Sequence, residues 1–222
     1  MHFDILTTQQ QKIFKQLSFT GNLDLYLAGG TALALRLGHR TSVDFDFYTD
    51  KHFDKGKMIE IFQEHLHHKV GFKVLRDFDN TFEIEFQTGL PLSCFHYNYP
   101  LLEKSADLYE VKIASLEDIA AMKLIAISQR GKRRDFVDMY YLIQKFGLNK
   151  ILELTAKKYA HFDIYNGLRG LLYFTDADND KDVLRIKVFD RAISWPKIKK
   201  YLINEAKNIQ LVSKKNLNQS AQ

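Results

Sequence analysis

The chain has 222 residues, of which 45% are hydrophobic and 27% are charged, and its formal net charge at pH 7 is +5. These values are typical of a globular protein with a substantial core, and they exclude an intrinsically disordered chain. Cys94 is the single cysteine, so no internal disulfide can form, and no stretch reaches the ~20 apolar residues that a membrane-spanning helix needs. The N-terminus also lacks the pattern of a secretion signal, and we expect a cytoplasmic protein without membrane contact.

Charge is divided unevenly along the chain. Residues 1–110 carry 11 Lys and Arg against 15 Asp and Glu, a net charge of −4, whereas residues 111–222 carry 21 against 12, a net charge of +9. An acidic half suits metal binding and a basic half suits a triphosphate or a nucleic acid, although a lysine-rich solvated surface would give the same counts. We predict one domain over residues 1–110 and a mainly helical region over residues 111–222.

The first predicted elements are a helix over residues 8–17 and a buried strand formed by the apolar run from Leu25 to Ala28. Gly29, Gly30 and Thr31 then turn the chain into a second helix. Because glycine has no Cβ atom, an anion can approach the backbone N–H groups at the positive end of this helix. The sequence therefore predicts a phosphate site at this turn.

A strand with alternating carboxylates follows between Ser42 and Tyr48. Its apolar residues face one side, and Asp44, Asp46 and Tyr48 face the other. Residues two apart on a strand are roughly 7 Å apart, so the two carboxylates can hold one or two Mg²⁺ or Mn²⁺ ions. A glycine pair or an Asp-x-Asp pair alone is more often structural, but their order within roughly 25 residues favours a joint phosphate and metal site.

Helical spacing predicts a helix over residues 58–70, and alternation predicts strands over residues 72–75, 81–87 and 90–97, the last two joined as a hairpin. In the second half, the residues from Ser115 to Asp118 resemble a capping box at the start of a helix. Lys123 stands one step off the apolar stripe of that helix. Its ammonium can reach a phosphate, or its stem can simply cover apolar surface as a structural lysine.

A cationic turn follows around Gly131. Arg133 and Arg134 lie beside it and suit a triphosphate or an RNA backbone, although Arg134 can also pair with Asp138, and Asp135 can cap the next helix. The chain beyond residue 147 is predicted to be mainly helical, and the last helix begins at Trp195.

Five blocks of sequence together resemble a known family. They are Ala28-Gly-Gly-Thr-Ala-Leu-Ala-Leu35, Gly38-His-Arg-x-Ser-x-Asp-Phe-Asp-Phe47, Tyr99-Pro-Leu-Leu102, Asp118-Ile-Ala-Ala-Met-Lys-Leu124 and Arg130-Gly-Lys-Arg-Arg-Asp-Phe-x-Asp138. The first two resemble the first motif of nucleotidyltransferases of the DNA polymerase β type. All five, in this order, resemble the AbiEii/AbiGii toxin family, whose members are nucleotidyltransferase toxins of type IV toxin–antitoxin and abortive-infection systems.

The resemblance implies an α/β (α+β) fold, in which a polymerase β-like nucleotidyltransferase domain with a mixed, twisted sheet precedes a mainly helical C-terminal region that completes the cleft. It implies transfer of a nucleoside monophosphate from an NTP to an acceptor hydroxyl of RNA, tRNA or protein, with Mg²⁺ or Mn²⁺ as cofactor and a cognate antitoxin as partner. From the resemblance and the residue chemistry together, we assign catalysis to Asp44, Asp46 and Lys123. We assign nucleotide binding to Gly29, Gly30, Thr31, Arg133 and Arg134.

One position departs from the family pattern. Ser93 stands where the resemblance leads us to expect a third carboxylate, and a hydroxyl cannot replace its charge. Glu83 or Glu85 on the preceding strand could take its place, and we assign Glu85 as the third metal ligand, although an exposed glutamate pair on a strand is commonly structural. Two alternative functions follow. One is a catalytically impaired protein that binds a nucleotide or a partner, and the other is a glycosyltransferase that uses Asp-x-Asp with a metal.

Overall fold

The computed structural model describes residues 1–66, 70–78 and 80–219. Contacts within the chain define two compact units. Unit 1 comprises residues 1–119 with 185–187, and unit 2 comprises residues 120–184 with 188–222. Among the described helices, none contains an 18-residue stretch that is apolar enough to cross a membrane.

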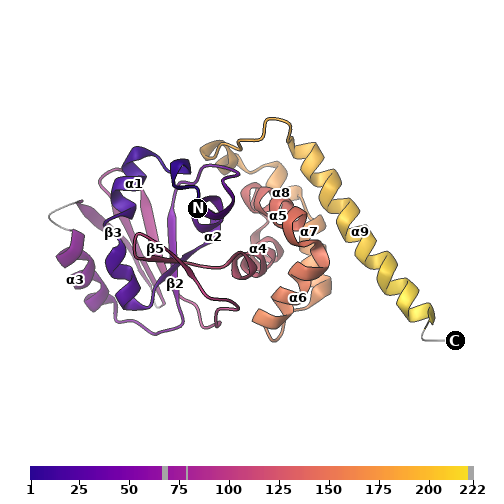
Figure 1. The fold of residues 1–222 in the computed structure, drawn as a ribbon, viewed down its shortest axis with the longest axis horizontal. Coiled ribbons are helices and arrows are strands. Elements are labelled where there is room, and N and C mark those ends of the chain that lie inside the picture. Colours follow the sequence, from indigo (N-terminus) through magenta and orange to yellow (C-terminus); the bar gives the residue numbers. More distant parts are fainter. Residues whose placement is uncertain (67–69, 79, 220–222) are drawn as a thin grey trace. The chain divides into compact units, whose positions relative to one another are not determined.

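The described residues of unit 1 form a mixed sheet of seven strands in the order β3-β4-β5-β2-β1-β7-β6 (Figure 1). The strands are β1 (Tyr26–Ala28), β2 (Phe45–Thr49), β3 (Phe72–Phe78), β4 (Thr81–Phe86), β5 (Pro91–His96), β6 (Ala106–Leu108) and β7 (Val111–Ile113). The pairs β1–β7 and β2–β5 are parallel, and the other neighbours are antiparallel. This sheet confirms the predicted α/β class. Alternation does not reveal β6 and β7, because three residues are too few to show a period.

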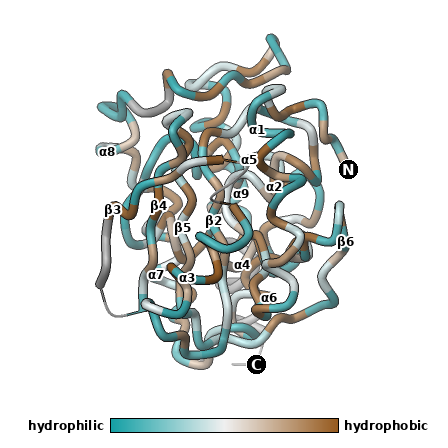
Figure 2. The backbone as a smooth tube through the Cα atoms, turned by 90° about the vertical axis from the view of Figure 1, so that its left-hand side faces the viewer, coloured by the Kyte–Doolittle hydropathy of each residue, from teal (hydrophilic) through white to brown (hydrophobic). Residues whose placement is uncertain are grey.

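The two faces of the sheet differ as the alternation predicts. Side chains such as Phe45, Phe82 and Leu92 are fully buried on one face, whereas their neighbours along the strands are half-buried on the other. Figure 2 shows hydrophobic and hydrophilic stretches succeeding one another along these strands. The apolar face carries the core of unit 1, and the opposite face carries the polar side chains considered below.

Short helices accompany the sheet of unit 1. They are η1 (Phe3–Ile5), α1 (Thr8–Phe14), η2 (Ser18–Leu23), α2 (Gly29–Leu37) and α3 (Lys55–Leu66). Helices α1 and α3 pack on the apolar face of the sheet, because the rings of Phe14 and Phe45 lie 5.8 Å apart and those of Phe62 and Phe82 lie 5.1 Å apart. Aromatic pairs at these separations add to the stability that burial alone provides.

Capping side chains determine where two of these helices begin. Thr7 and Gln10 form a reciprocal capping box at α1, with N–H to side-chain oxygen distances of 2.9 and 3.2 Å. The carboxylate of Asp54 accepts a hydrogen bond from the Lys57 N–H at 2.8 Å, and α3 therefore begins three residues before the predicted start. Residues 67–69, within the predicted helix, lie outside the described residues.

Helix α4 (Leu116–Arg130) begins where the capping box was predicted. Ser115 Oγ accepts a hydrogen bond from the N–H of Asp118 at 2.9 Å and donates one to its Oδ2 at 2.7 Å. The same carboxylate accepts hydrogen bonds from the N–H groups of Leu102 and Glu103, at 2.9 and 3.2 Å. The fully buried Asp118 therefore ties the end of the Tyr99-to-Leu102 block to the start of α4.

Unit 2 consists of helices, as predicted for the C-terminal region. They are the greater part of α4, then α5 (Arg133–Phe146), α6 (Leu148–Lys158), α7 (Ile164–Leu172), α8 (Thr175–Asp178), η3 (Lys181–Arg185) and α9 (Trp195–Gln219). Helix α7 lies directly against α4, because a Cβ atom on Gly170 would come within 2.6 Å of the Cα atom of Ser128. The sequence predicts a domain boundary after residue 110. The β6–β7 hairpin has one strand on each side of this position, and the boundary stays a prediction.

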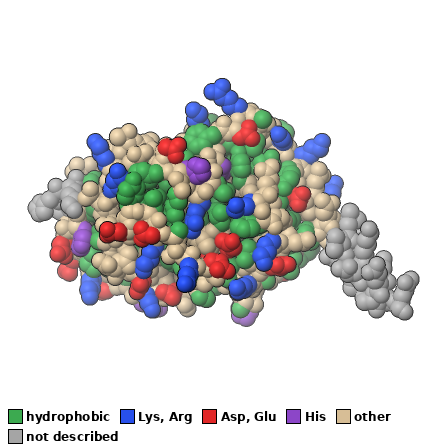
Figure 3. Space-filling view, in the orientation of Figure 1, with side chains coloured by type: hydrophobic (Ala, Val, Ile, Leu, Met, Phe, Trp, Pro, Cys, Tyr) green, Lys and Arg blue, Asp and Glu red, His purple; other side chains and the backbone are tan. Residues whose placement is uncertain are grey.

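Charged side chains of both signs are interspersed on the face drawn in Figure 3, within each unit. The uneven division of charge along the sequence therefore does not give this face a surface of one sign.

Candidate nucleotide and metal site

The glycine turn and the carboxylate strand meet in unit 1. β1 pairs with β2 so that Ala28 lies opposite Asp46, and Gly29 follows Ala28 with a φ of +66°. A Cβ atom built on Gly29 would lie 3.0 Å from Oδ2 of Asp46. The carboxylate of Asp46 thus rests against the backbone of the turn, which is the arrangement that a joint phosphate and metal site requires.

Replacing Gly29 by alanine tests this contact. Gly29→Ala forces a left-handed φ on an L-residue, which costs about 1–2 kcal/mol, and it also pushes on the Asp46 carboxylate. Gly89→Ala is the matched control, because Gly89 has a φ of +78° and nothing within 4 Å of the added Cβ. We expect comparable strain in urea denaturation of both variants, but a loss of nucleotidyl transfer only in Gly29→Ala. Equal transfer rates in the two variants would contradict a role for the turn.

A buried cation lies beneath the second glycine. Arg40 is only 1% exposed, and its Nη2 atom would be 2.5 Å from a Cβ atom on Gly30. Its Nη1 donates a hydrogen bond to the carbonyl of Thr41 at 2.8 Å. Arginine stays protonated even when it is buried, so the Arg40 guanidinium places a positive charge close to the turn. The sequence motif contains Arg40, but no local pattern indicates that its side chain is buried at this turn.

Thr31 holds the carboxylate strand in place. Its side chain is 1% exposed, and its hydroxyl hydrogen-bonds to the main-chain oxygen of Asp44. The same Oγ1 lies 2.7 Å from Ser42 Oγ and 3.4 Å from Asp44 Oδ1. Thr31 was predicted to bind the nucleotide. These contacts indicate that its hydroxyl positions Asp44 beside the start of α2, and its role toward a nucleotide stays a prediction.

Strand register decides which residues accompany Asp46. Ser93 lies opposite Asp46 on β5, at the position where the family pattern leads us to expect a carboxylate. Glu83 lies opposite Ser93 on β4, so Asp46, Ser93 and Glu83 form one row across three strands. Glu85 lies opposite Pro91, and its Oε1 is 2.8 Å from Nζ of Lys73. The metal role assigned to Glu85 stays a prediction, and the register favours Glu83 for it.

The residues present fit a magnesium ion that a nucleotide brings with it. Within the described residues, no group of three or more His, Cys, Asp or Glu side chains is close enough to enclose a metal ion. Magnesium is commonly held by one or two carboxylates, several waters and the phosphates of a substrate. Asp44 and Asp46, placed beside the glycine turn, match that donor set.

Lys123 occupies a buried ion-pair cluster in unit 2. Its Nζ lies 2.7 Å from Oδ1 of Asp135 and 2.7 Å from Oδ2 of Asp138, both on α5. The lysine side chain is 6% exposed and the two aspartates are fully buried. Arg130 lies 3.6 Å from the other oxygen of Asp135. The cluster joins α4 to α5, and the predicted catalytic role of Lys123 stays a prediction.

Arg133 forms a network within unit 2. Its Nε and Nη2 donate hydrogen bonds to the carbonyls of Ala177 and Asp178 at 2.8 and 2.7 Å, and its guanidinium lies 5.1 Å from the ring of Trp195. Asp178 in turn accepts hydrogen bonds from Trp195 Nε1 at 2.6 Å and from Lys199 Nζ at 2.9 Å, and these bonds lower the pKa of its carboxyl group. The nucleotide roles of Arg133 and Arg134 stay predictions.

We expect Arg133→Ala to lower the free energy of unfolding by about 1–3 kcal/mol, because two carbonyl hydrogen bonds and a cation–π contact disappear. Trp195 is the single tryptophan and lies in unit 2, so its fluorescence during urea denaturation reports this loss directly. Lys150→Ala on α6 is the control, since Lys150 is exposed and its contact with Glu153 is 3.4 Å long. A stable Arg133→Ala variant that has lost NTP affinity would restore the predicted nucleotide role.

Comparison with known proteins places the chain in a family. Residues 18–103 and 97–205 match the family described as nucleotidyl transferase AbiEii toxin, type IV TA system. A protein of Aquifex aeolicus (strain VF5), described as uncharacterised, is 37% identical over 187 residues, which are 76% of this chain and 82% of that relative.

Two solved structures share the fold. JHP933 from Helicobacter pylori superposes with a TM-score of 0.58 and 18% identity, covering 97% of each chain. MenT4, a nucleotidyltransferase toxin from Mycobacterium tuberculosis H37Rv, gives a TM-score of 0.59 and 15% identity over 87% of this chain and 80% of MenT4. At these identities the likeness concerns the fold alone. The sequence match extends over most of the chain, and the chain therefore belongs to the AbiEii family of nucleotidyl transferase toxins of type IV toxin–antitoxin systems.

Proposed function

We propose that this protein transfers a nucleoside monophosphate from an NTP to an acceptor hydroxyl. The hydroxyl oxygen forms a bond to the α-phosphorus, the bond from that phosphorus to the bridging oxygen breaks, pyrophosphate leaves, and the hydroxyl proton passes to water. The observation that carries the proposal is the contact between the Gly29 backbone and the Asp46 carboxylate, supported by the family assignment. It joins a phosphate-binding turn to a metal-binding acid within a few ångströms.

The glycine turn would bind the β and γ phosphates. The first backbone N–H groups of α2 have no partner within the helix, and the helix dipole favours an anion there. Arg40, buried beneath Gly30, adds a fixed positive charge that needs no rearrangement when the triphosphate arrives. The absence of side chains at Gly29 and Gly30 keeps the approach to the backbone open.

Asp44 and Asp46 would hold Mg²⁺ or Mn²⁺. Glu83 would be the third acid, because it lies in the same row as Asp46, with Ser93 between them. When bound, the ion would offset charge on the α-phosphate and make the acceptor hydroxyl more acidic. Thr31 fixes the position of Asp44, so the carboxylates are oriented before substrate binds.

In the cell, we infer that the protein acts as the toxin of a toxin–antitoxin pair that serves phage defence by abortive infection. The family assignment supports this role, and a cognate antitoxin is the expected protein partner. The acceptor is a hydroxyl of RNA, tRNA or protein.

The test is incubation of the full chain with each α-³²P-labelled NTP, Mg²⁺ and a cell extract, followed by separation of RNA from protein. We expect label in one macromolecular fraction, and no label when EDTA replaces Mg²⁺. Ser93 beside Asp46 favours one alternative, a catalytically impaired protein that binds nucleotide. Mg²⁺-dependent NTP binding without transfer of label to any fraction would select that alternative.

A further inference from the structure

A hollow on the surface of unit 1 lies beside helix α1. Its volume is about 600 Å³, which is within the range of sites that hold small molecules. Residues of α1 form one wall, and Val70, which follows α3, and Thr88, in the turn between β4 and β5, contribute to the others. All of these residues belong to unit 1. We call this feature the α1 hollow.

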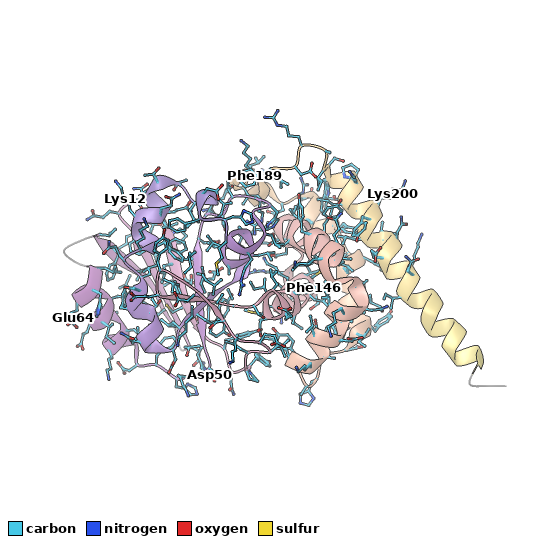
Figure 4. All side chains as sticks on the ribbon, in the orientation of Figure 1. Lys12, Asp50, Glu64, Phe146, Phe189 and Lys200 are labelled. Atoms are coloured by element: carbon cyan, nitrogen blue, oxygen red, sulfur yellow. The ribbon has the colours of Figure 1, made fainter. Side chains whose placement is uncertain are left out.

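The wall formed by α1 is polar and carries one positive charge. Lys12 faces the α1 hollow between two amide side chains, Gln9 one turn before it and Gln16 just beyond the end of the helix. Lys12 is exposed and is labelled in Figure 4. Among the described residues, none forms an ion pair or hydrogen bond with its ammonium group, and none of those lining the hollow is acidic. The α1 hollow therefore suits a ligand with an anionic group.

The rest of the lining indicates what else such a ligand contains. Ile13 is buried and Val70 is half-buried, and together they offer apolar surface to a flat ring. The amides of Gln9 and Gln16 each carry a donor and an acceptor, as hydrogen bonding to the edge of a nucleobase requires. A nucleoside monophosphate combines a flat base, a polar edge and an anionic phosphate in one small molecule.

The α1 hollow is separate from the candidate nucleotide and metal site. Helix α1 packs on the apolar face of the sheet, where the ring of Phe14 lies 5.8 Å from that of Phe45. Asp46 is the next residue along β2, so its side chain points to the opposite face. A nucleotide in the α1 hollow would therefore not be the one that reacts at the carboxylates.

One buried side chain nevertheless connects α1 with the carboxylates. Gln10 is 7% exposed, and its Nε2 donates a hydrogen bond to the main-chain carbonyl of Ser42 at 2.8 Å. Ser42 Oγ lies 2.7 Å from the hydroxyl of Thr31, which in turn hydrogen-bonds to the main-chain oxygen of Asp44. A ligand that fixes α1 thus favours one position of Ser42 and, through Thr31, one position of Asp44.

We propose that the α1 hollow binds a nucleoside monophosphate as a regulatory ligand, with its phosphate at Lys12, and that this ligand strengthens the binding of Mg²⁺-NTP at Asp44 and Asp46. The regulatory effect rests on the proposed function, whereas the binding site does not. Coupling between two sites is reciprocal, so a bound NTP strengthens the binding of the monophosphate by the same factor.

Calorimetric titration of the full-length protein with AMP in EDTA tests the site, because removing Mg²⁺ disables the candidate metal site. Lys12→Ala should raise the Kd for AMP about tenfold, because the phosphate loses its cation. Lys15→Ala should leave the Kd unchanged. Lys15 is the matched control, because it is also exposed and follows α1, but its ammonium lies 4.9 Å from the ring of Tyr109. Equal Kd values in the wild type and Lys12→Ala, or no binding at millimolar AMP, would overturn the site.

The regulatory effect is measured with an NTP analogue that has a methylene group between its α and β phosphates and cannot transfer. With Mg²⁺ present, AMP should lower the Kd of this analogue about fivefold. Gln10→Glu should abolish the effect and leave AMP binding intact, because glutamate keeps an oxygen for the capping box and removes the N–H donor to Ser42.

Two outcomes separate this inference from the proposed function. An unchanged Kd for the analogue, or one that AMP raises by competition, would overturn the regulatory role. No binding of the analogue, together with AMP binding that depends on Lys12, would reject the proposed function and retain the α1 hollow as a ligand site.

Discussion

Asp46→Asn should lower nucleotidyl transfer about a thousandfold, equivalent to about 4 kcal/mol in the activation barrier, while the chain stays folded. Asparagine keeps the shape of the side chain against Gly29 but removes the charge that would hold Mg²⁺. Asp46 is only half-buried, so the free energy of unfolding should change by less than about 1 kcal/mol. Label transfer and urea denaturation measure the two effects. Unchanged transfer in a folded Asp46→Asn variant would reject the catalytic assignment.

The two glutamates of β4 provide a matched comparison within this experiment. Glu83→Gln removes the acid in register with Ser93 and Asp46, and it should lower transfer about tenfold or more. Glu85→Gln removes an acid paired with the exposed Lys73, a contact that contributes little to stability, and it should leave transfer near the wild-type rate. The opposite result would assign the third acid to Glu85, as predicted from sequence.

Sequence patterns predicted those parts of the site that are formed by residues close together in the sequence. The alternation from Ser42 to Tyr48 and the glycine pair identified a strand and a turn. Both are present, but β2 begins at Phe45, so Asp46 lies on the strand and Asp44 directly precedes it. The choice between Glu83 and Glu85 could not be made in this way, because both face the same side of one strand. Only the pairing of β4 with β5 and β5 with β2 distinguishes them, and this register depends on contacts between distant parts of the sequence.

The environments of two cations also depend on contacts that local sequence patterns do not predict. Arg40 has a charged side chain in a polar stretch, and nothing local indicates that it is fully buried under Gly30. Lys123 was placed correctly beside an apolar stripe, but its partners are on α5, beyond the turn that ends α4. Helical periodicity shows which face of a helix is buried, but it does not show which charges of the next helix will meet it. The partners of Lys123 could therefore not be predicted from its own helix.

Lys123→Met should destabilise unit 2 by about 3–5 kcal/mol, because Asp135 and Asp138 would stay buried after losing the cation that contacts both at 2.7 Å. Trp195 fluorescence during urea denaturation follows this unit, and the midpoint should fall accordingly. Lys150→Met on α6 is the control, since Lys150 is exposed and its contact with Glu153 is 3.4 Å long. Its stability should change by less than about 0.5 kcal/mol.

A compensated variant separates the structural role of Lys123 from the predicted catalytic one. Replacing the cluster together, as Lys123→Met with Asp135→Asn and Asp138→Asn, removes the buried charges of both signs and should recover most of the lost stability. If this folded variant transfers label, Lys123 acts by joining α4 to α5. If it is folded and inactive, while NTP binding persists, the lysine or its aspartates take part in the chemistry. A Lys123→Met variant as stable as the wild type would contradict the ion-pair cluster itself, because two buried carboxylates cannot lose their cation without cost.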